Sequence, residues 1–326
     1  MSATVLDAGV DTWSPCWWLE PTSAAGRHLA EVCSLRSGGG GLYPEAIDGH
    51  RVGYYGSGLL WAEGHPGGDT LGRPADLLAV LDRLELALLD AGLPLPIGRR
   101  GEDLYGDRHE GFAGIRRLDS TVDLAVDSTP EGLAIMAGIA AVARDLPRSK
   151  SNVWWDGRGR VQTVALHGFA GGQLLGRVYD KGAEAGTADV GRLLRPEDQR
   201  RWAKGYRRGV EELTGQYVRE KFVSRFAPLW RASKGVTVGG PIILAGKLAE
   251  AVERDELTPS QARILAGHLV LDGIAPVGSG RTRRRLRSMC REHGLVLADG
   301  VLEEVEVDLH SVLDAAMESD TWGAGG

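Results

Sequence analysis

The sequence predicts an α+β fold, in which an antiparallel sheet carries helices on one face and a small helical domain follows. Short apolar segments separated by turn residues occur along the first two thirds of the chain. Other segments in this part have apolar residues at helical spacing, and the last third is predicted to form three helices. We expect an N-terminal extension (1–37), a core (38–232) and a C-terminal domain (241–326).

Composition and length are those of an ordinary globular protein. The 326 residues allow a substantial core and two or three domains. Cys16, Cys33 and Cys290 show no metal-ligand spacing, which indicates a reducing compartment. The first residues do not form a signal peptide, and no run of about 18 uncharged apolar residues occurs. We therefore expect a soluble, cytoplasmic protein without a membrane partner.

The net charge of −6 is unevenly distributed along the chain. Residues 98–235 carry 24 Lys and Arg against 18 Asp and Glu, whereas the segments before and after are acidic, with 5 against 12 and 9 against 14. A basic middle between acidic ends is typical of a face that binds a polyanion such as nucleic acid. The alternative is that these charges lie on solvated helix faces.

The first elements of the core are predicted from turn residues and helical spacing. Residues 38–68 read as a β-meander, because short apolar runs alternate with glycine-rich turns. Residues 74–96 have leucines at helical spacing, and the helix is expected to stop at Gly92, with Pro94 beyond it.

A β-branched strand is predicted at 114–127, where alternation places Asp119, Asp123 and Asp127 on one face. Three carboxylates on one face are costly unless they bind a cation or pair with arginines. Hard oxygen ligands suit Mg²⁺ or Mn²⁺. Neutralisation by the two arginines that precede Asp119 in this strand is the alternative.

Three further elements complete the predicted core. Residues 129–146 open with Thr-Pro-Glu, which is typical of a helix start, and continue as a helix. Residues 163–180 form two strands around a glycine-rich turn, and residues 195–230 are predicted to be a long, basic, helical region.

The C-terminal domain begins after a predicted boundary at 233–240. Helices are expected at 242–254, 257–273 and 281–294, and a two-stranded wing is expected to turn at Asp299-Gly300. This order fits a winged helix-turn-helix or, equally, a helical bundle with a salt-bridged surface helix. In the first case the last helix would contact DNA phosphates and base edges through Arg281, Arg283, Arg284, Arg285 and Arg287.

Three short motifs occur in a fixed order between residues 45 and 230. They are Glu63-Gly64, then Arg117-Leu118-Asp119 with Asp123, then Arg177-Val178-Tyr179-Asp180-Lys181 with Glu184. Their order and spacing resemble the trans-acting Rep family of rolling-circle replication initiators, which occur on small plasmids, filamentous phages and actinobacterial mobile elements. The last motif is the most specific of the three.

The resemblance implies a relaxase-like or Rep-like core that nicks DNA at a replication origin. A tyrosine phenolate would attack one phosphodiester and hold the 5′-phosphate, and the released 3′-OH would prime synthesis. Lys181 or Arg177 would stabilise the developing charge or lower the phenol pKa from about 10. The DNA partner would be an origin hairpin with single- and double-stranded parts. A host helicase and a second copy of the chain would be further partners. The Mg²⁺ or Mn²⁺ ligands would be Glu63, Asp119, Asp123 and Glu184.

The chain departs from the family at the nucleophile. The family's tyrosine generally lies in the preceding strand, where this chain has Ala165 and no tyrosine. Tyr179 is therefore better interpreted as a residue that shapes the site. Three explanations are open. The nucleophile has moved to Tyr179, Tyr206 or Tyr217; the protein binds and opens an origin without nicking it; or Ala165 is an inactivating substitution.

A tryptophan pair, Trp154-Trp155, lies among cations that include Arg158 and Arg160. Aromatic side chains between cations can stack on unpaired bases, although such a pair in a strand is as often part of a core. A metal-dependent phosphohydrolase of small substrates ranks last, because it leaves the arginine-rich helix unexplained.

Overall fold

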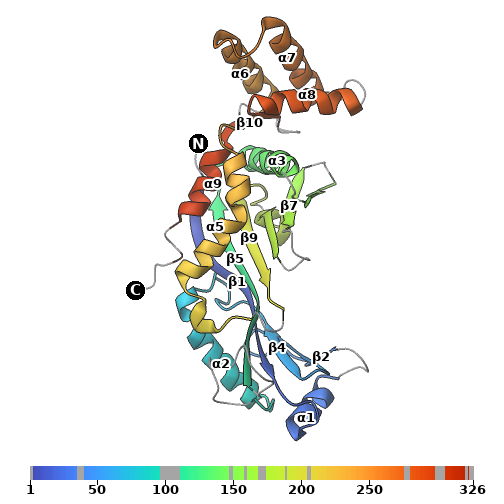
Figure 1. The fold of residues 1–326 in the computed structure, drawn as a ribbon, viewed down its shortest axis with the longest axis vertical. Helices are drawn as coiled ribbons and strands as arrows, with labels where there is room; N and C mark the ends of the chain where they lie inside the picture. Colours follow the sequence, from blue (N-terminus) through green and yellow to red (C-terminus); the bar gives the residue numbers. More distant parts are fainter. Residues whose placement is uncertain are drawn as a thin grey trace. The chain divides into compact units, whose positions relative to one another are not determined.

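The computed structural model describes residues 3–34, 40–95, 111–146, 150–157, 160–167, 174–187, 189–203, 207–274, 280–297, 305–319 and 322. It confirms the predicted α+β class with a large antiparallel sheet (Figure 1). The strands are β1 (Thr4–Trp18), β2 (Gly40–Leu42), β3 (Arg51–Tyr55), β4 (Leu59–Glu63), β5 (Gly111–Ala125), β6 (Lys150–Trp155), β7 (Val161–His167), β8 (Leu174–Asp180), β9 (Leu193–Arg201), β10 (Thr237–Gly239), β11 (Leu295–Leu297) and β12 (Glu306–Asp308). The helices are α1 (Ala24–Val32), α2 (Leu77–Asp90), α3 (Thr129–Asp145), α4 (Lys181–Ala185), α5 (Gly215–Ala232), α6 (Pro241–Glu253), α7 (Pro259–Ile274), α8 (Gly280–Glu292) and α9 (Leu309–Glu318), with 3₁₀ turns at Pro74–Asp76 and Val210–Glu212.

The described strands form two sheets. Nine strands follow the order β2-β3-β4-β1-β5-β9-β8-β7-β6, and three follow the order β11-β10-β12. In the large sheet the pairs β2–β3, β3–β4, β1–β4, β6–β7 and β7–β8 are antiparallel. In the small sheet β10 is parallel to β11 and antiparallel to β12.

The chain divides into two compact units, each built from segments that are distant in sequence. Unit 1 comprises Met1–Leu6, Val122–Pro196 and Val223–Ser319, and unit 2 comprises Asp7–Thr121, Glu197–Phe222 and Asp320–Gly326. The predicted limits at 1–37, 38–232 and 241–326 are a different division of the chain and stay predictions.

Unit 2 contains the predicted meander and the helix that follows it. Strands β2, β3 and β4 pair in sequence order, which confirms the prediction for 38–68. Helix α2 buries Leu81, Leu84 and Leu88 and ends before Gly92. Gly92 has φ +78°, a left-handed conformation that favours glycine, so the predicted helix stop is also confirmed.

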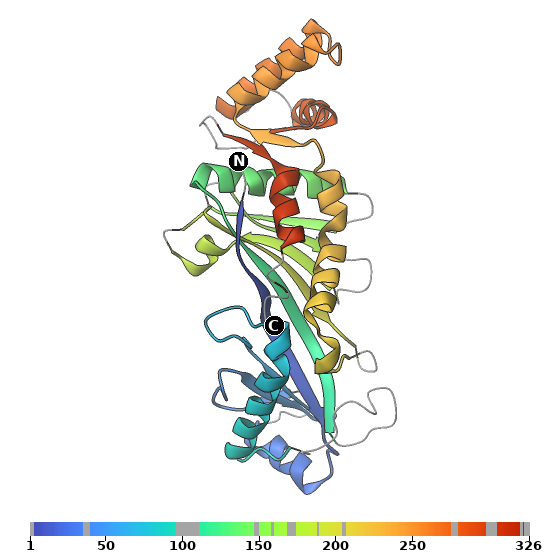
Figure 2. The ribbon, with the colours of Figure 1, turned by 90° about the vertical axis from the view of Figure 1, so that its left-hand side faces the viewer.

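In unit 1, helix α3 and the hairpin β7–β8 are confirmed as predicted. The α3 N-cap is Ser128, whose side chain accepts from the Glu131 backbone N–H, while the Glu131 carboxylate accepts from the Ser128 N–H at 3.0 Å. Helix α9 lies beside α5, where the Trp230 indole donates to Asp314 at 3.0 Å and stacks on His310 (Figure 2).

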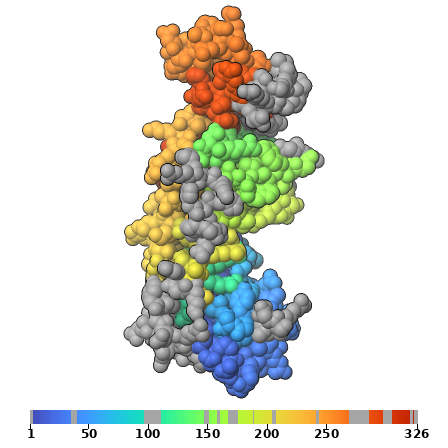
Figure 3. Space-filling view, turned by 45° about the vertical axis from the view of Figure 1, so that its right-hand side comes forward, coloured from blue at the N-terminus to red at the C-terminus, as the bar shows by residue number. Residues whose placement is uncertain are grey.

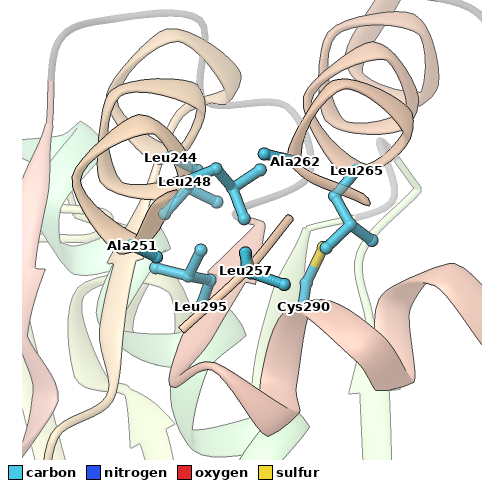
Figure 4. Packing of buried hydrophobic residues seen from close by; sticks show 8 residues of the cluster. All are labelled: Leu244, Leu248, Ala251, Leu257, Ala262, Leu265, Cys290 and Leu295. Carbon is cyan, nitrogen blue, oxygen red and sulfur yellow. The ribbon is translucent and has the colours of Figure 1, made fainter. Parts of the chain in front are cut away.

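The three predicted C-terminal helices are confirmed as α6, α7 and α8, and they share a hydrophobic core with β11. Thr258 and Gln261 cap the start of α7 reciprocally, as the Thr-Pro sequence predicts. Figure 4 shows how this core is built from side chains of these elements and of the α6–α7 connection, namely Leu244, Leu248, Ala251, Leu257, Ala262, Leu265, Cys290 and Leu295.

The prediction of a helical region over 195–230 is wrong in its first part. Residues 193–201 are the strand β9, and only Gly215–Ala232 form a long helix. Two β9 side chains form hydrogen bonds to β5. Arg195 donates to Asp123 at 2.8 Å, and Gln199 donates to Asp119 at 3.2 Å. Tertiary pairing therefore overrides the low β-propensity of these charged residues.

Two smaller predictions also need correction. The strands of the expected wing, β11 and β12, do not pair with each other, because both flank β10, which lies inside the predicted boundary 233–240. Asp299 and Gly300 lie outside the described residues. Asp127 does not share the face of Asp119, because β5 ends at Ala125 and Asp127 is exposed.

Two glycine substitutions in helices of unit 1 are expected to change stability in opposite directions. A Cβ at Gly132 of α3 would collide with the backbone carbonyl oxygen of Gly191, so Gly132→Ala should lower the free energy of unfolding by about 1–3 kcal/mol. A Cβ at Gly246 of α6 meets nothing within 4 Å, so Gly246→Ala should raise it by about 0.5–1 kcal/mol. Urea unfolding measures both, and equal effects would contradict the close packing of α3 on the turn at Gly191.

Candidate functional site

A cluster in unit 2 joins residues of the first two motifs. The Arg117 guanidinium donates to Glu63 Oε1 at 2.7 Å and to Asp119 Oδ1 at 3.0 Å. Asp119, which is only 1 % exposed, also accepts from the Gln199 amide at 3.2 Å. Glu63 of the first motif and Asp119 of the second motif thus meet at the guanidinium group of Arg117.

A second arginine completes the coordination of Glu63. Arg116 Nη2 donates to Glu63 Oε2 at 3.3 Å, its Nε donates to the Ser14 hydroxyl at 2.8 Å, and its guanidinium lies 4.4 Å from the centre of the Trp61 ring. Both oxygens of Glu63 therefore accept from guanidinium groups that are themselves held in place.

Asp119 is the most perturbed carboxyl group of the cluster. Burial raises its pKa from 3.8 to about 6, the hydrogen bond from Arg117 opposes this shift, and the negative charge of Glu197 adds to it. Such a carboxyl group is paired rather than solvated, and it titrates close to neutral pH.

The remaining two predicted metal ligands lie in unit 1, and each has a cationic partner. Asp123 accepts from the Arg195 Nε at 2.5 Å and from its Nη2 at 2.8 Å. Glu184, in the short helix α4, accepts from Lys181 Nζ at 2.7 Å.

The described geometry does not fit a divalent metal site on these carboxylates. Their oxygens accept hydrogen bonds from Arg116, Arg117, Arg195 and Lys181. A Mg²⁺ ion requires carboxylate oxygens that coordinate the ion itself. Across the described residues no three His, Cys, Asp or Glu side chains form a group that could hold a metal ion. Binding of Mg²⁺ or Mn²⁺ stays a prediction.

The third motif forms the end of β8 and the start of α4. Tyr179 is 4 % exposed, and the Arg177 guanidinium and the Lys181 ammonium lie 4.7 and 5.9 Å from its ring centre. Asp180 caps α4, because its carboxylate accepts from the backbone N–H of Ala183 at 2.9 Å and of Gly191 at 2.7 Å. The Tyr-Asp-Lys sequence therefore has a local structural role that the motif alone did not predict.

The family's nucleophile position is buried. Ala165 is 2 % exposed in β7 and pairs with Arg177 of β8 and Asn152 of β6. Of the other candidates, Tyr217 is half-buried in α5, where burial raises its pKa, and Tyr206 lies outside the described residues. A raised pKa is the opposite of what an activated phenol needs.

The structure describes some of the predicted DNA-binding residues. Arg285 is exposed, Arg287 and Arg160 are half-buried, and Arg160 pairs with Asp156 at 2.5 Å. Trp154 and Trp155 are 49 % and 44 % exposed, so they are not a buried core pair. Outside the description lie Arg158 and the side chains of Arg281, Arg283 and Arg284.

Residues that sequence analysis missed lie on β9. Arg195 and Gln199, the partners of Asp123 and Asp119, were assigned to a helix. No strand signal could have found them, because residues 195–201 (RPEDQRR) show no alternation of apolar and polar residues.

Comparison with known proteins does not establish a family. No family model and no curated protein matches the chain. A solved structure of a rolling-circle replication initiator protein from Geobacillus stearothermophilus is similar at 14% identity and a TM-score of 0.28, over 65% of this chain and 78% of that one. Similarity at this level establishes neither a shared fold nor a shared function. In the described part of the chain, no helix has the length and hydropathy needed to cross a membrane.

The stability of the protein should depend on the titration of Asp119. With a folded pKa of about 6, the folded state holds a proton between pH 4 and 6 that the unfolded state has lost. The stabilisation by this proton is complete below the unfolded pKa and is lost as the pH rises through about 6. The free energy of unfolding of the wild type, relative to Asp119→Asn, should fall by on the order of 3 kcal/mol from pH 4 to pH 7. Urea unfolding across this range tests it, with the exposed Asp127→Asn as control, and a constant difference would contradict it.

Removal of the shared guanidinium should both destabilise unit 2 and create a cation site. Arg117→Met leaves Asp119 buried without its main counter-ion, so the free energy of unfolding should fall by about 3–5 kcal/mol at pH 7. The two carboxylates that met at Arg117 would then face one another, and millimolar Mn²⁺ should raise the melting temperature of this variant.

The control is Arg195→Met, which releases a single carboxylate, Asp123. Mn²⁺ should leave the melting temperatures of this variant and of the wild type unchanged. A rise in the wild type would show that the carboxylates bind metal despite their arginines.

Proposed function

We propose that the chain is a DNA-binding protein of replication initiation, from a plasmid, phage or integrative element, which binds origin DNA without cutting it. The observation that carries the proposal is the contact of Glu63, Arg117 and Asp119 in one cluster. These residues belong to separate sequence motifs that resemble those of the Rep family, and their meeting in space supports a shared site rather than a chance match.

The chemistry of the site favours binding over cleavage. A tyrosine nucleophile must bring its phenolate oxygen to a phosphorus atom, whereas Tyr179 is buried between β-strand neighbours and Ala165 has no hydroxyl group. The carboxylates that could hold a metal ion accept from arginine and lysine side chains instead. Contact with DNA phosphates needs only cationic side chains, which Arg160, Arg285 and Arg287 provide.

A nickase that uses Tyr179 is the second candidate. One observation favours it, since Arg177 and Lys181 lie 4.7 and 5.9 Å from the Tyr179 ring centre and would stabilise a phenolate. In that reaction the phenolate oxygen would bond to phosphorus while the bond to the 3′-oxygen breaks, and the 3′-oxygen would take up a proton. It requires a rearrangement that exposes Tyr179.

Binding and cleavage can be separated in one experiment. A hairpin that binds is first selected from pooled oligonucleotides by fluorescence anisotropy, and it is then incubated with the protein and Mn²⁺ before intact-protein mass spectrometry. We expect binding that weakens steeply between 50 and 200 mM salt and no nucleotide adduct. An adduct that Tyr179→Phe abolishes would establish the nickase and refute the proposal. If no hairpin binds at low salt, both candidates are wrong.

A further inference from the structure

Unit 1 contains a pocket that brings together two segments predicted separately to bind DNA. It lies between α3, the end of β6, the start of β7, helix α8 and β11. Trp155 is the last residue of β6, and Arg160 lies in the β6–β7 connection. Arg287 and Arg291 come from α8, more than a hundred residues later. Figure 3 shows the α8 surface (red-orange) next to the surface of α3 and β6 (green).

The lining of the pocket is cationic. Four arginines line it, Arg144, Arg160, Arg287 and Arg291, and none of its lining residues is acidic. Two of the arginines are oriented by carboxylates next to the pocket, since Arg160 pairs with Asp156 at 2.5 Å and Arg291 pairs with Asp145 at 2.6 Å. These cations come from three different elements, so an anion in the pocket can be contacted from several sides.

An aromatic ring lies among these cations. Trp155 lines the pocket with 44 % of its surface exposed, and the Arg144 guanidinium lies 5.5 Å from the centre of its ring. The indole is therefore held beside a cation and still presents surface to solvent. A flat ring system could stack on it, which an aliphatic side chain at this position would not allow.

Part of the pocket lining is apolar and built of small residues. Ala137, Ala140 and Ala141 of α3 form part of it, and they leave room where larger side chains would fill the space. Cys290 and Leu295 also line the pocket and belong to the hydrophobic core of the α6–α8 region (Figure 4). This lining is thus part of a packed core, which keeps the pocket's shape when a ligand enters.

We propose that this pocket binds single-stranded DNA, with one unpaired base stacked on Trp155 and the flanking phosphates held by the arginines. The inference rests on the proposed function and specifies that this pocket binds DNA in its single-stranded form. Guanidinium groups match phosphate oxygens in charge and geometry. A base-paired duplex offers no free base face to Trp155, and an acidic peptide would pair with the arginines and leave the indole without a partner.

The adjacent tryptophan provides a matched control. Trp154 has a similar exposure, 49 %, but it does not line the pocket. Fluorescence anisotropy with a labelled oligo-dT strand and with a blunt duplex of equal length compares Trp155→Ala, Trp154→Ala and the wild type. Circular dichroism melting confirms that both variants remain folded.

We expect Trp155→Ala to weaken binding of the single strand roughly 5- to 100-fold and binding of the duplex less than about twofold. Trp154→Ala should change neither by more than about twofold. Arg287→Gln should weaken both forms of DNA and reduce the salt dependence by about one counter-ion. Its control is Arg254→Gln, at an exposed arginine that follows α6 as its C-cap and does not line the pocket.

Other outcomes would overturn the inference in distinguishable ways. If Trp155→Ala and Trp154→Ala weaken single-strand binding equally while hairpin binding persists, the pocket is not the site but the proposed function stands. If the wild type binds neither form of DNA, both proposals fail. If a polyglutamate peptide displaces oligo-dT from the wild type and itself binds Trp155→Ala more weakly, the pocket is a site for acidic peptides.

Discussion

A guanidinium shared by two carboxylates is the interaction on which the arrangement around β5 depends. Asp119 is 1 % exposed, and an ionised carboxylate at such a position costs several kcal/mol unless a counter-ion accompanies it. Arg117 supplies the counter-ion from two residues away on the same strand and also reaches Glu63 at the end of β4. A slip of one residue would carry Arg117 and Asp119 together to the opposite face of the sheet, away from Glu63, so the contact of Arg117 with Glu63 also helps to specify the register of β5.

The same requirement explains why residues 193–201 form a strand. Residues four apart share a face in a strand as well as in a helix, so the spacing of Arg195 and Gln199 alone does not select a strand. The two side chains reach β5 because β9 lies beside it in the sheet. Their partners, Asp123 and Asp119, lie 72 and 80 residues earlier in the chain. The helix α2 and the α3 capping box could be predicted because Gly92, Ser128 and Glu131 act within their own segments. β9 could not, because the residues that determine it are distant.

The candidate site could be predicted in part for the same reason. The motif order grouped Glu63 with Asp119, and both accept from Arg117. The alternatives for their counter-ion were a divalent metal or arginine. Sequence could not decide between them, because the strand pattern places Arg117 on the face of Asp119 but does not show that Glu63, 54 residues earlier, reaches the same guanidinium. Ala165 was recognised as a departure from the family, but the burial of Tyr179 depends on its neighbours in the sheet.

The distribution of charge along the chain is a poor measure of where a polyanion binds. Residues 98–235 are the basic segment, yet Arg116, Arg117 and Arg195 within it neutralise carboxylates of the same fold. Conversely, Arg287 and Arg291 belong to a segment with 9 Lys and Arg against 14 Asp and Glu, and they line the cationic pocket of unit 1. A phosphate responds to charges within about a Debye length, which is roughly 8–10 Å at moderate salt, and not to the net charge of a stretch of sequence. The convergence of arginines from α3, the β6–β7 connection and α8 around Trp155 is therefore a stronger reason to expect nucleic acid than the basic middle of the sequence.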